Sequence, residues 1–235
     1  MPVQSTVFEH PAQELTSLPQ GNRRLRYLSM LAWELSKDGP EAVEEWAEAA
    51  PAAFPRYKAA VFLKATSTLA GIDPAGTAEW VSAYLGRPYA DGVLRAVARS
   101  WALRDPRAAM VWLASLPPGL KRDASVSYAF RVWLERTPKA AEEWLRGEVP
   151  APALDAAASV MVGRHRDGSR EEALGWALRL DERGLREQVL SNIAGEWLRE
   201  DPDSASVWLE GAGLSEPLLS AIRASAEGAR EPDEA

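Results

Sequence analysis

Two histidines, His10 and His165, carry the side chains that could most readily exchange protons near neutral pH. His165 lies in the glycine-interrupted stretch Gly163-Arg164-His165-Arg166-Asp167-Gly168. In an irregular loop there it would act as a general base or contact a phosphate. The alternative is that His165 fills a position that aromatic residues occupy elsewhere in the chain, and that the helix ends early at Gly168. We favour the second interpretation, because no evident metal ligand or catalytic partner accompanies this histidine.

The other side chains offer little catalytic chemistry. The chain has no cysteine, which excludes disulfides, thiol nucleophiles and thiolate metal sites. Glycine-rich phosphate loops, the His-Glu-x-x-His zinc motif and the Gly-x-Ser-x-Gly elbow are all missing from the sequence. Most carboxylates fall where first helical turns are expected, and there the helix dipole accounts for them. We therefore expect no catalytic residue, no metal and no cofactor.

A row of polar side chains is the better candidate for a site. At 100° per residue these side chains lie opposite the apolar stripes of the helices expected below: Lys64, Arg99, Tyr128, Arg131 and Asn192. The other positions of this row are mostly small residues, and they include Val160, Gly163 and Gly195. Arg99 and Arg131 are 32 residues apart, so we expect them on adjacent helices about 8–10 Å apart. Two guanidinium groups beside a tyrosine could hold the carboxylate of a peptide or an acidic segment. The alternative is a solvated face whose arginines pair with acids such as Glu135.

The spacing of the tryptophans indicates the elements that hold these side chains. Six of the ten tryptophans are separated by 34, 32, 32, 32 and 32 residues: Trp46, Trp80, Trp112, Trp144, Trp176 and Trp208. A second set, Trp101, Trp133 and Trp197, lies five residues before a proline, with Leu69 and His165 in the corresponding positions. We assign Trp33 to the same element of a slightly lengthened first copy. Because the rings recur in phase with the apolar stripe, we expect them to be core residues rather than a ligand-stacking platform.

Each copy predicts a pair of helices. Apolar residues spaced i, i+3, i+4 and i+7, as at Leu94, Val97, Ala98 and Trp101, form one face of a first helix. Second helices are expected to start near 40, 74, 106, 138, 170 and 202, mostly at Asp-Pro, since Asp caps free amides and Pro fits the first position. Thr137-Pro138 is expected to do the same with a hydroxyl. Such small hairpins must stack to bury their apolar faces.

The predicted fold is all-α, a right-handed αα-hairpin solenoid of about six 32-residue repeats with a C-terminal capping helix. Residues 23–227 would form the array, with the capping helix at 216–227. Residues 1–22 would be a polar tail or partial cap, with a short helix from Pro11 to Leu18, and 228–235 a disordered acidic tail. The arrangement resembles the tetratricopeptide class and HEAT-like helix-turn-helix solenoids in architecture, although it lacks the Trp-x2-Leu-Gly-x2-Tyr signature. The resemblance implies a concave surface that binds another protein.

Charge and composition exclude some classes of binding partner. The net charge of −7 and the pI near 5.1 argue against nucleic-acid binding, which needs a basic face. No apolar run approaches a membrane span of about 18 residues, and Met1–His10 does not resemble a signal peptide; we expect a cytoplasmic protein. The leading hypothesis is a non-catalytic scaffold that binds a protein or peptide, possessing an acidic or carboxylate group, on its concave face. The alternatives are an α-solenoid enzyme with a site near His165 and, third, a helical-repeat protein that binds nucleic acid.

Overall fold

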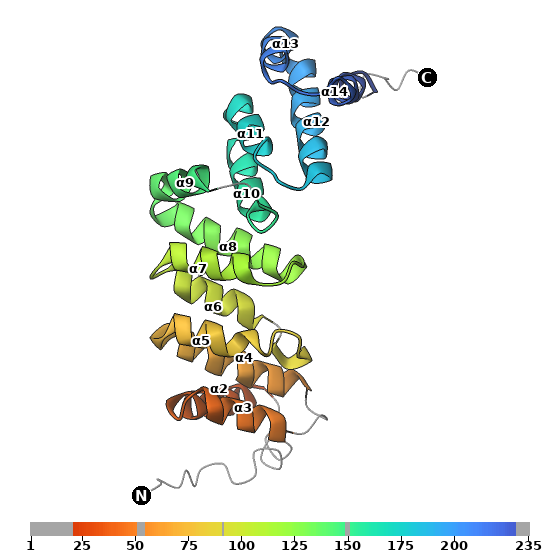
Figure 1. The fold of residues 1–235 in the computed structure, drawn as a ribbon. Helices are drawn as coiled ribbons and strands as arrows, with labels where there is room; N and C mark the ends of the chain where they lie inside the picture. Colours follow the sequence, from red (N-terminus) through yellow and green to blue (C-terminus); the bar gives the residue numbers. More distant parts are fainter. Residues whose placement is uncertain (1–20, 51–54, 91, 149–150, 229–235) are drawn as a thin grey trace, which may run out of the picture. The chain divides into compact units, whose positions relative to one another are not determined.

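The computed structural model describes residues 21–50, 55–90, 92–148 and 151–228. These residues form thirteen α-helices and one short 3-10 helix with no strand, so the predicted all-α class is confirmed for the described part of the chain (Figure 1). The chain divides into two compact units, Met1–Leu113 and Ala114–Ala235, and each is described by itself. Within the described residues, no helix is both long and apolar enough to span a membrane.

The first unit contains six α-helices and the 3-10 helix: α2 (Asn22–Lys37), α3 (Pro40–Ala49), α4 (Pro55–Ile72), α5 (Pro74–Ser82), η1 (Pro88–Ala90), α6 (Val93–Ala102) and α7 (Pro106–Ser115). Helix α7 ends two residues beyond the boundary between the units. The second unit contains α8 (Leu120–Arg136), α9 (Pro138–Gly147), α10 (Asp155–His165), α11 (Arg170–Ala177), α12 (Arg183–Glu200), α13 (Pro202–Gly211) and α14 (Glu216–Gly228).

The short second helices α3, α5, α7, α9, α11 and α13 begin at Pro40, Pro74, Pro106, Pro138, Arg170 and Pro202. Capping explains most of these starts. Asp73 Oδ1 accepts a hydrogen bond from the Gly76 amide at 3.0 Å, and Asp201 Oδ1 accepts one from the Ser204 amide at 3.1 Å. Ser169 caps α11, the only one of the six that lacks the proline, through the Glu172 amide at 3.2 Å.

The prediction that the Thr137 hydroxyl caps α9 is wrong. Its side chain makes no capping hydrogen bond, although α9 still begins at Pro138. Thr137 has ψ 71°, whereas the capping Ser169 has ψ 103°. At the smaller angle the short hydroxyl does not reach the amide, while the longer carboxylate of Asp201 does so at a similar ψ of 84°. The proline alone, whose ring fixes φ, is enough to start this helix.

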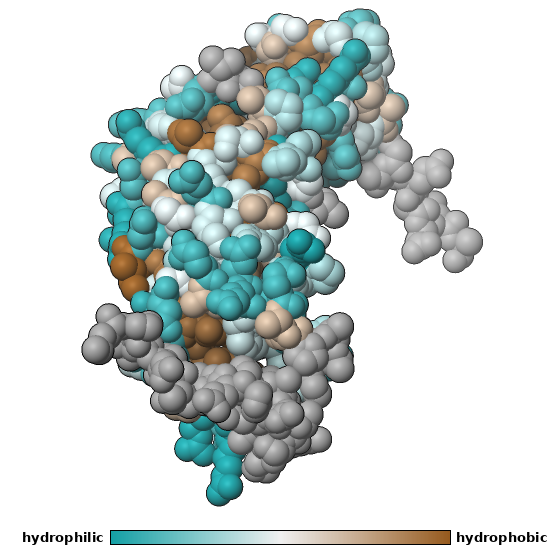
Figure 2. Space-filling model, turned by 60° about the horizontal axis from the view of Figure 1, so that its bottom comes forward, coloured by the Kyte–Doolittle hydropathy of each residue, from teal (hydrophilic) through white to brown (hydrophobic). Residues whose placement is uncertain are grey.

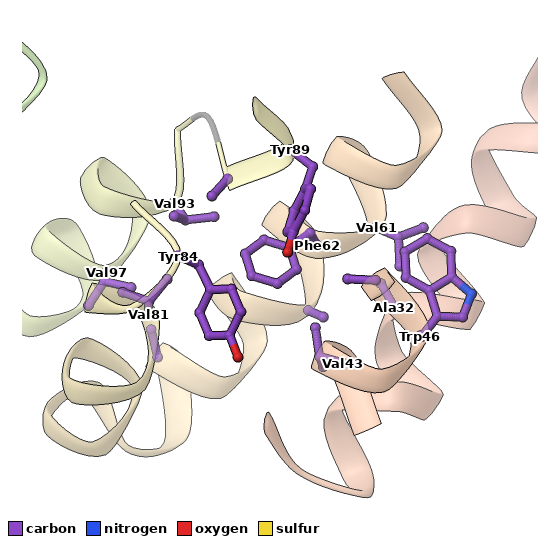
Figure 3. Close-up of a cluster of buried hydrophobic side chains, with 14 of the residues drawn as sticks. Ala32, Val43, Trp46, Val61, Phe62, Val81, Tyr84, Tyr89, Val93 and Val97 are labelled. Atoms are coloured by element: carbon purple, nitrogen blue, oxygen red, sulfur yellow. The ribbon is translucent and has the colours of Figure 1, made fainter. Parts of the chain in front are cut away.

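Aromatic packing forms the core of the first unit. Helix α4 packs against α2 on one side and α6 on the other, and η1 also contacts it. The centroid of the fully buried Phe62 ring lies 5.0 Å from that of Tyr89 and 5.9 Å from that of Tyr84 (Figure 3). The Trp80 centroid lies 5.5 Å from that of Phe62. Tyr89 Oη donates to Glu48 Oε1 at 2.8 Å, and burial together with this bond raises the pKa of Tyr89 to about 12. A hydrogen bond to Glu44 likewise raises the pKa of Tyr84 to about 12. Tyr84 and Tyr89 therefore both stay neutral.

In the second unit the hairpins close on paired tryptophans. Trp133 of α8 and Trp144 of α9 have centroids 5.1 Å apart, and Trp197 of α12 and Trp208 of α13 are 6.4 Å apart. Helix α8 packs against α10, and α11 packs against α12. Helix α14 packs against α12 and coincides closely with the predicted capping helix.

Two arginines, Arg104 and Arg179, each join a hairpin to the one before it. Arg104 donates to the Ile72 carbonyl at 2.7 Å and to that of Gly71, at the end of α4. Arg179 does the same for α9, bonding the carbonyls of Leu145 at 3.1 Å and Glu148 at 2.7 Å. The last carbonyls of a helix have no partner within it and carry negative charge. A guanidinium from the next hairpin satisfies them.

One tryptophan departs from the core assignment. All ten tryptophans lie in the described residues, and nine are buried or half-buried, but Trp33 is 51% exposed. In the other hairpins the first-helix position lies eleven residues before the second-helix tryptophan, as for Trp133 and Trp144. Counting eleven back from Trp46 gives Leu35, which packs against the core. Trp33 therefore lies on the expected first helix but two residues before the repeated position, and the expectation that its ring is a core residue is wrong.

The predicted tail or cap at residues 1–22, its short helix and the acidic tail lie almost entirely outside the described residues. Only Gly21 and Asn22 at the first end and Gly228 at the other are described, and both Asn22 and Gly228 belong to helices.

Candidate functional site

The five predicted site residues are divided between the two units. Lys64 lies on α4 and Arg99 on α6 in the first unit, while Tyr128 and Arg131 lie on α8 and Asn192 on α12 in the second. Tyr128 is half-buried and the other four are exposed. Since Arg99 and Arg131 belong to different units, their side-by-side placement stays a prediction. One further row position, Gly195, is buried, because Ser225 of α14 lies within 3.0 Å of where its Cβ would be.

Arg131 does line a pocket. This pocket has a volume of about 380 Å³ and lies between α8 and α10. It is lined by Arg131, Leu134, Glu135, Ser159, Val160, Gly163 and Arg164. Residues 131, 160 and 163 all belong to the predicted row. Gly163 leaves this wall open: a Cβ built on it would meet no atom within 4 Å. The helical periodicity of α8 and α10 therefore brings the row residues to one pocket.

The charges of this pocket are unusual for the second unit. Arg131 and Arg164 are both exposed, and within the described residues neither makes an ion pair or a side-chain hydrogen bond. The pairing of Arg131 with Glu135, which was the alternative interpretation of the row, is not found within the described residues. Elsewhere in the unit arginines are paired: Arg166 lies 2.5 Å from Glu196, and Arg170 lies 3.0 Å from Glu200. The pocket thus offers two guanidinium groups with free donors, beside the apolar side chains of Leu134 and Val160.

A second pocket of about 480 Å³ lies between α9 and α11, lined by Arg146, Glu171, Glu172, Gly175, Trp176 and Arg179. Its arginines already have partners. Arg146 is 2.6 Å from Glu142, and Arg179 bonds the end of α9. Both guanidiniums also lie over the Trp176 ring, at 5.0 and 5.9 Å from its centroid. These contacts hold α9 and α11 together and leave little free binding capacity.

His165 lies on a helix rather than in a loop. Helix α10 continues through Gly163 and Arg164 and ends at His165, three residues before the expected end at Gly168, so the loop that a general base at His165 would require is not formed. His165 Nδ1 lies 2.6 Å from Glu172 Oε2, and its Nε2 is buried without a partner. The side chain lines none of the pockets described above. Within the described residues, no group of three or more acidic or histidine side chains is placed to hold a metal ion.

Two polar residues of the second unit, Arg164 and Asp155, were not among the predicted site residues. Arg164 was named only as part of the glycine-interrupted stretch, but on α10 it falls one turn after Val160 and reaches the same pocket. Asp155 is buried, and its two carboxylate oxygens accept hydrogen bonds from the amides of Asp181 at 2.7 Å and Glu182 at 2.9 Å. This carboxylate fixes the start of α12. A contact across 26 residues leaves no local pattern by which it could have been found.

Comparison with known proteins adds no assignment: no family model, curated protein or solved structure matches this chain.

Proposed function

We propose that the chain is a non-catalytic protein-interaction module, built as an array of αα-hairpin repeats, that binds an acidic segment of a partner protein. The pocket between α8 and α10 is the proposed contact point. The repeat spacing and the neighbour-to-neighbour packing of the helices support an architecture like that of tetratricopeptide or HEAT-like solenoids. The unpaired guanidiniums of Arg131 and Arg164 beside an apolar wall are the observation that carries the proposal.

The pocket suits a side chain or chain end better than a whole small molecule. Its volume of about 380 Å³ is near the lower end of ligand pockets, which span about 300–1,000 Å³. Carboxylates bind arginine through two parallel hydrogen bonds, which lysine cannot reproduce. Leu134 and Val160 would pack against an apolar neighbour of the bound acid. Glu135 would repel a second acid next to it and accept a donor instead.

Binding to a displayed library of short peptides tests this function. Peptides selected on the wild-type chain are synthesised and their affinity is measured by fluorescence anisotropy. Replacing Arg131 and Arg164 together with alanine should weaken binding more than about tenfold, since each charge-assisted hydrogen bond contributes about 1.5–3 kcal/mol. Added salt should weaken binding as well, because exposed charges are screened over about 10 Å at 0.1 M.

A steric variant and a matched control accompany this experiment. Gly163→Phe fills the pocket without meeting neighbouring atoms at its Cβ and should also abolish binding. Arg183→Ala removes an exposed arginine of α12 that is paired with Glu187, and should leave affinity unchanged. If the selected peptides lack acids, or bind the double variant as well as the wild type, this pocket is not the contact point. Arg99→Ala then asks whether the first unit carries the surface.

A further inference from the structure

A further pocket lies at the end of the second unit, between α12, α13 and α14. Its volume is about 250 Å³, and its walls contain four leucines and two opposite charges: Leu198, Leu209, Leu214, Leu219, Glu210 and Arg223. Figure 2 shows that apolar residues gather in separate patches on a largely hydrophilic surface. A pocket with four leucines and a pair of opposite charges is therefore a distinct feature of this unit. We call it the α14 pocket.

Close packing holds the walls of the α14 pocket in place. Helix α14 lies so near α12 that the Ser225 hydroxyl is 3.0 Å from where a Cβ on Gly195 would be. Arg199 of α12 also donates a hydrogen bond to the Ser225 carbonyl at 3.1 Å. Ile222 of α14 and Leu209 of α13 are both buried. The pocket is therefore formed before any ligand binds, and a ligand need not order its walls.

The two charges of the α14 pocket are not paired with each other. In the part of the chain that the structure describes, the Glu210 side chain makes no ion pair and no hydrogen bond. The ion pair that Arg223 makes there is with Glu216 at 3.8 Å, and both side chains are exposed, by 59% and 76%. A guanidinium has five N–H donors, so this long pair leaves most of them free. The pocket therefore has a free acceptor from α13 and free donors from α14.

The hairpin repeat does not account for these charges. One 32-residue repeat earlier, the positions of Glu210 and Arg223 are occupied by Leu178 and Ser191. Helices α11 and α12 form and pack against each other with these uncharged residues. The fold of a hairpin and its neighbour therefore does not require an acid and an arginine at these two positions.

The lining indicates the chemistry of the ligand. One carboxylate and one guanidinium give the α14 pocket no net charge, so a ligand with one positive and one negative group matches it. A carboxylate can accept two parallel hydrogen bonds from Arg223, and an ammonium group can donate to Glu210. The leucines favour an apolar group beside these charges. The volume of about 250 Å³ is below the range of about 300–1,000 Å³ for drug-sized ligands, which favours a small molecule.

We propose that the α14 pocket binds a free apolar α-amino acid such as leucine, whose carboxylate binds Arg223, whose ammonium group binds Glu210 and whose side chain packs on the leucines. This site is separate from the pocket between α8 and α10 and does not depend on the function proposed for it. Because the ligand bridges α13 and α14, its binding stabilises the C-terminal end of the second unit.

Isothermal titration calorimetry of the full chain with L-leucine tests the proposal. Leucine should bind saturably at one site and raise the Tm. Glu210→Gln and Arg223→Met should each weaken binding more than about tenfold, because each removes a charge-assisted hydrogen bond. Ser206→Phe, at an exposed position of α13 that lines the pocket, should block binding while the far-UV circular dichroism spectrum stays unchanged. Glu227→Gln is the matched control, since Glu227 is exposed on α14 but does not line the pocket, and it should leave the affinity unchanged.

A series of related ligands gives a second readout. Leucinamide lacks the carboxylate and N-acetylleucine lacks the ammonium group, so each should bind at least about tenfold more weakly than leucine. Aspartate and lysine, whose side chains would place an extra charge against the leucines, should bind more weakly as well. Absence of leucine binding, or leucine binding that neither Glu210→Gln nor Arg223→Met weakens, would overturn the proposal. So would equally tight binding of leucinamide, which assigns the pocket to the first residue of a peptide, or of N-acetylleucine, which assigns it to the last.

Discussion

In three of the hairpins, a contact between two tryptophan rings joins the two helices. Its two rings come from residues eleven apart, with centroids separated by 5.7 Å for Trp101 and Trp112 and by 5.1 Å for Trp133 and Trp144. The fifth hairpin has His165 in the first of these positions, and its imidazole bonds Glu172 instead. Pairs of tilted rings at these distances add about 0.5–1.5 kcal/mol to the free energy of burial.

Removing one ring of a pair should be costly. Trp133 is 4% exposed and contacts both Phe130 and Trp144. Trp133→Ala should therefore lower the free energy of unfolding by about 3–5 kcal/mol, the usual cost of deleting a large buried aromatic. Chemical denaturation monitored by circular dichroism measures this change. Val207→Ala, at a position 72% exposed in the same unit, should change the free energy by less than about 0.5 kcal/mol. Equal effects would contradict a core role for Trp133.

Tryptophan spacing predicted nine of these ten environments, because a ring that recurs with the apolar stripe must face the same neighbours. It failed at Trp33, which lies only two residues before the repeated position now seen to be Leu35. On a helix two residues correspond to about 200°, so this small error in register turned an outward side chain into an inward one.

At the scale of elements, helix starts were predictable because a cap is local chemistry. Asp73 and Asp201 accept hydrogen bonds from amides three residues further along the chain, so the residues of each cap can be recognised from a short stretch of sequence. The end of α10 was less predictable. Gly163 costs a helix about 1 kcal/mol, but buried Met161 and Val162 hold α10 in place through it. That packing keeps the chain helical as far as His165 and brings Arg164 to the pocket.

The cap of α13 should make stability depend on pH. Hydrogen bonds from the hydroxyl and then the amide of Ser204 lower the pKa of Asp201 below its ordinary value. The carboxylate therefore stabilises the fold above the unfolded-state value of about 3.9, and this contribution is lost as the pH falls through the lower folded-state value. Asp201→Ala should lower the Tm at pH 7, and the difference from wild type should shrink as the pH falls below about 4.

Asp203→Ala is the matched control for this cap. It removes a carboxylate from the same first turn, but within the described residues the Asp203 side chain makes no capping hydrogen bond. It should shift the Tm less, and its effect should report the helix dipole alone. A pH-independent difference for Asp201→Ala would show that the side chain acts by packing rather than as a charged cap.

At the scale of the molecule, each unit has an aromatic core of its own. In the first unit the core centres on Phe62, and in the second it includes Phe130, Trp133, Trp176 and Trp197. The boundary between the units lies within α7, three residues before the loop Leu116-Pro117-Pro118-Gly119. The nearly uniform spacing of the tryptophans does not predict this division. The spacing depends on features that the hairpins have in common, and these do not tell where the chain divides into units.

The second unit should therefore fold without the first. A fragment of residues 116–235 begins in the loop before α8 and keeps the aromatic core of its unit intact. Because the helices of this unit pack mainly against their neighbours along the chain, the fragment should give a strongly helical far-UV circular dichroism spectrum and a cooperative thermal transition. Its tryptophan emission should be blue-shifted. A fragment of residues 160–235, which cuts α10 and removes Trp133 and Trp144, should unfold with a broad transition at lower temperature. If the longer fragment is unfolded too, the core of the second unit depends on contacts from the first, and the chain is one cooperative structure.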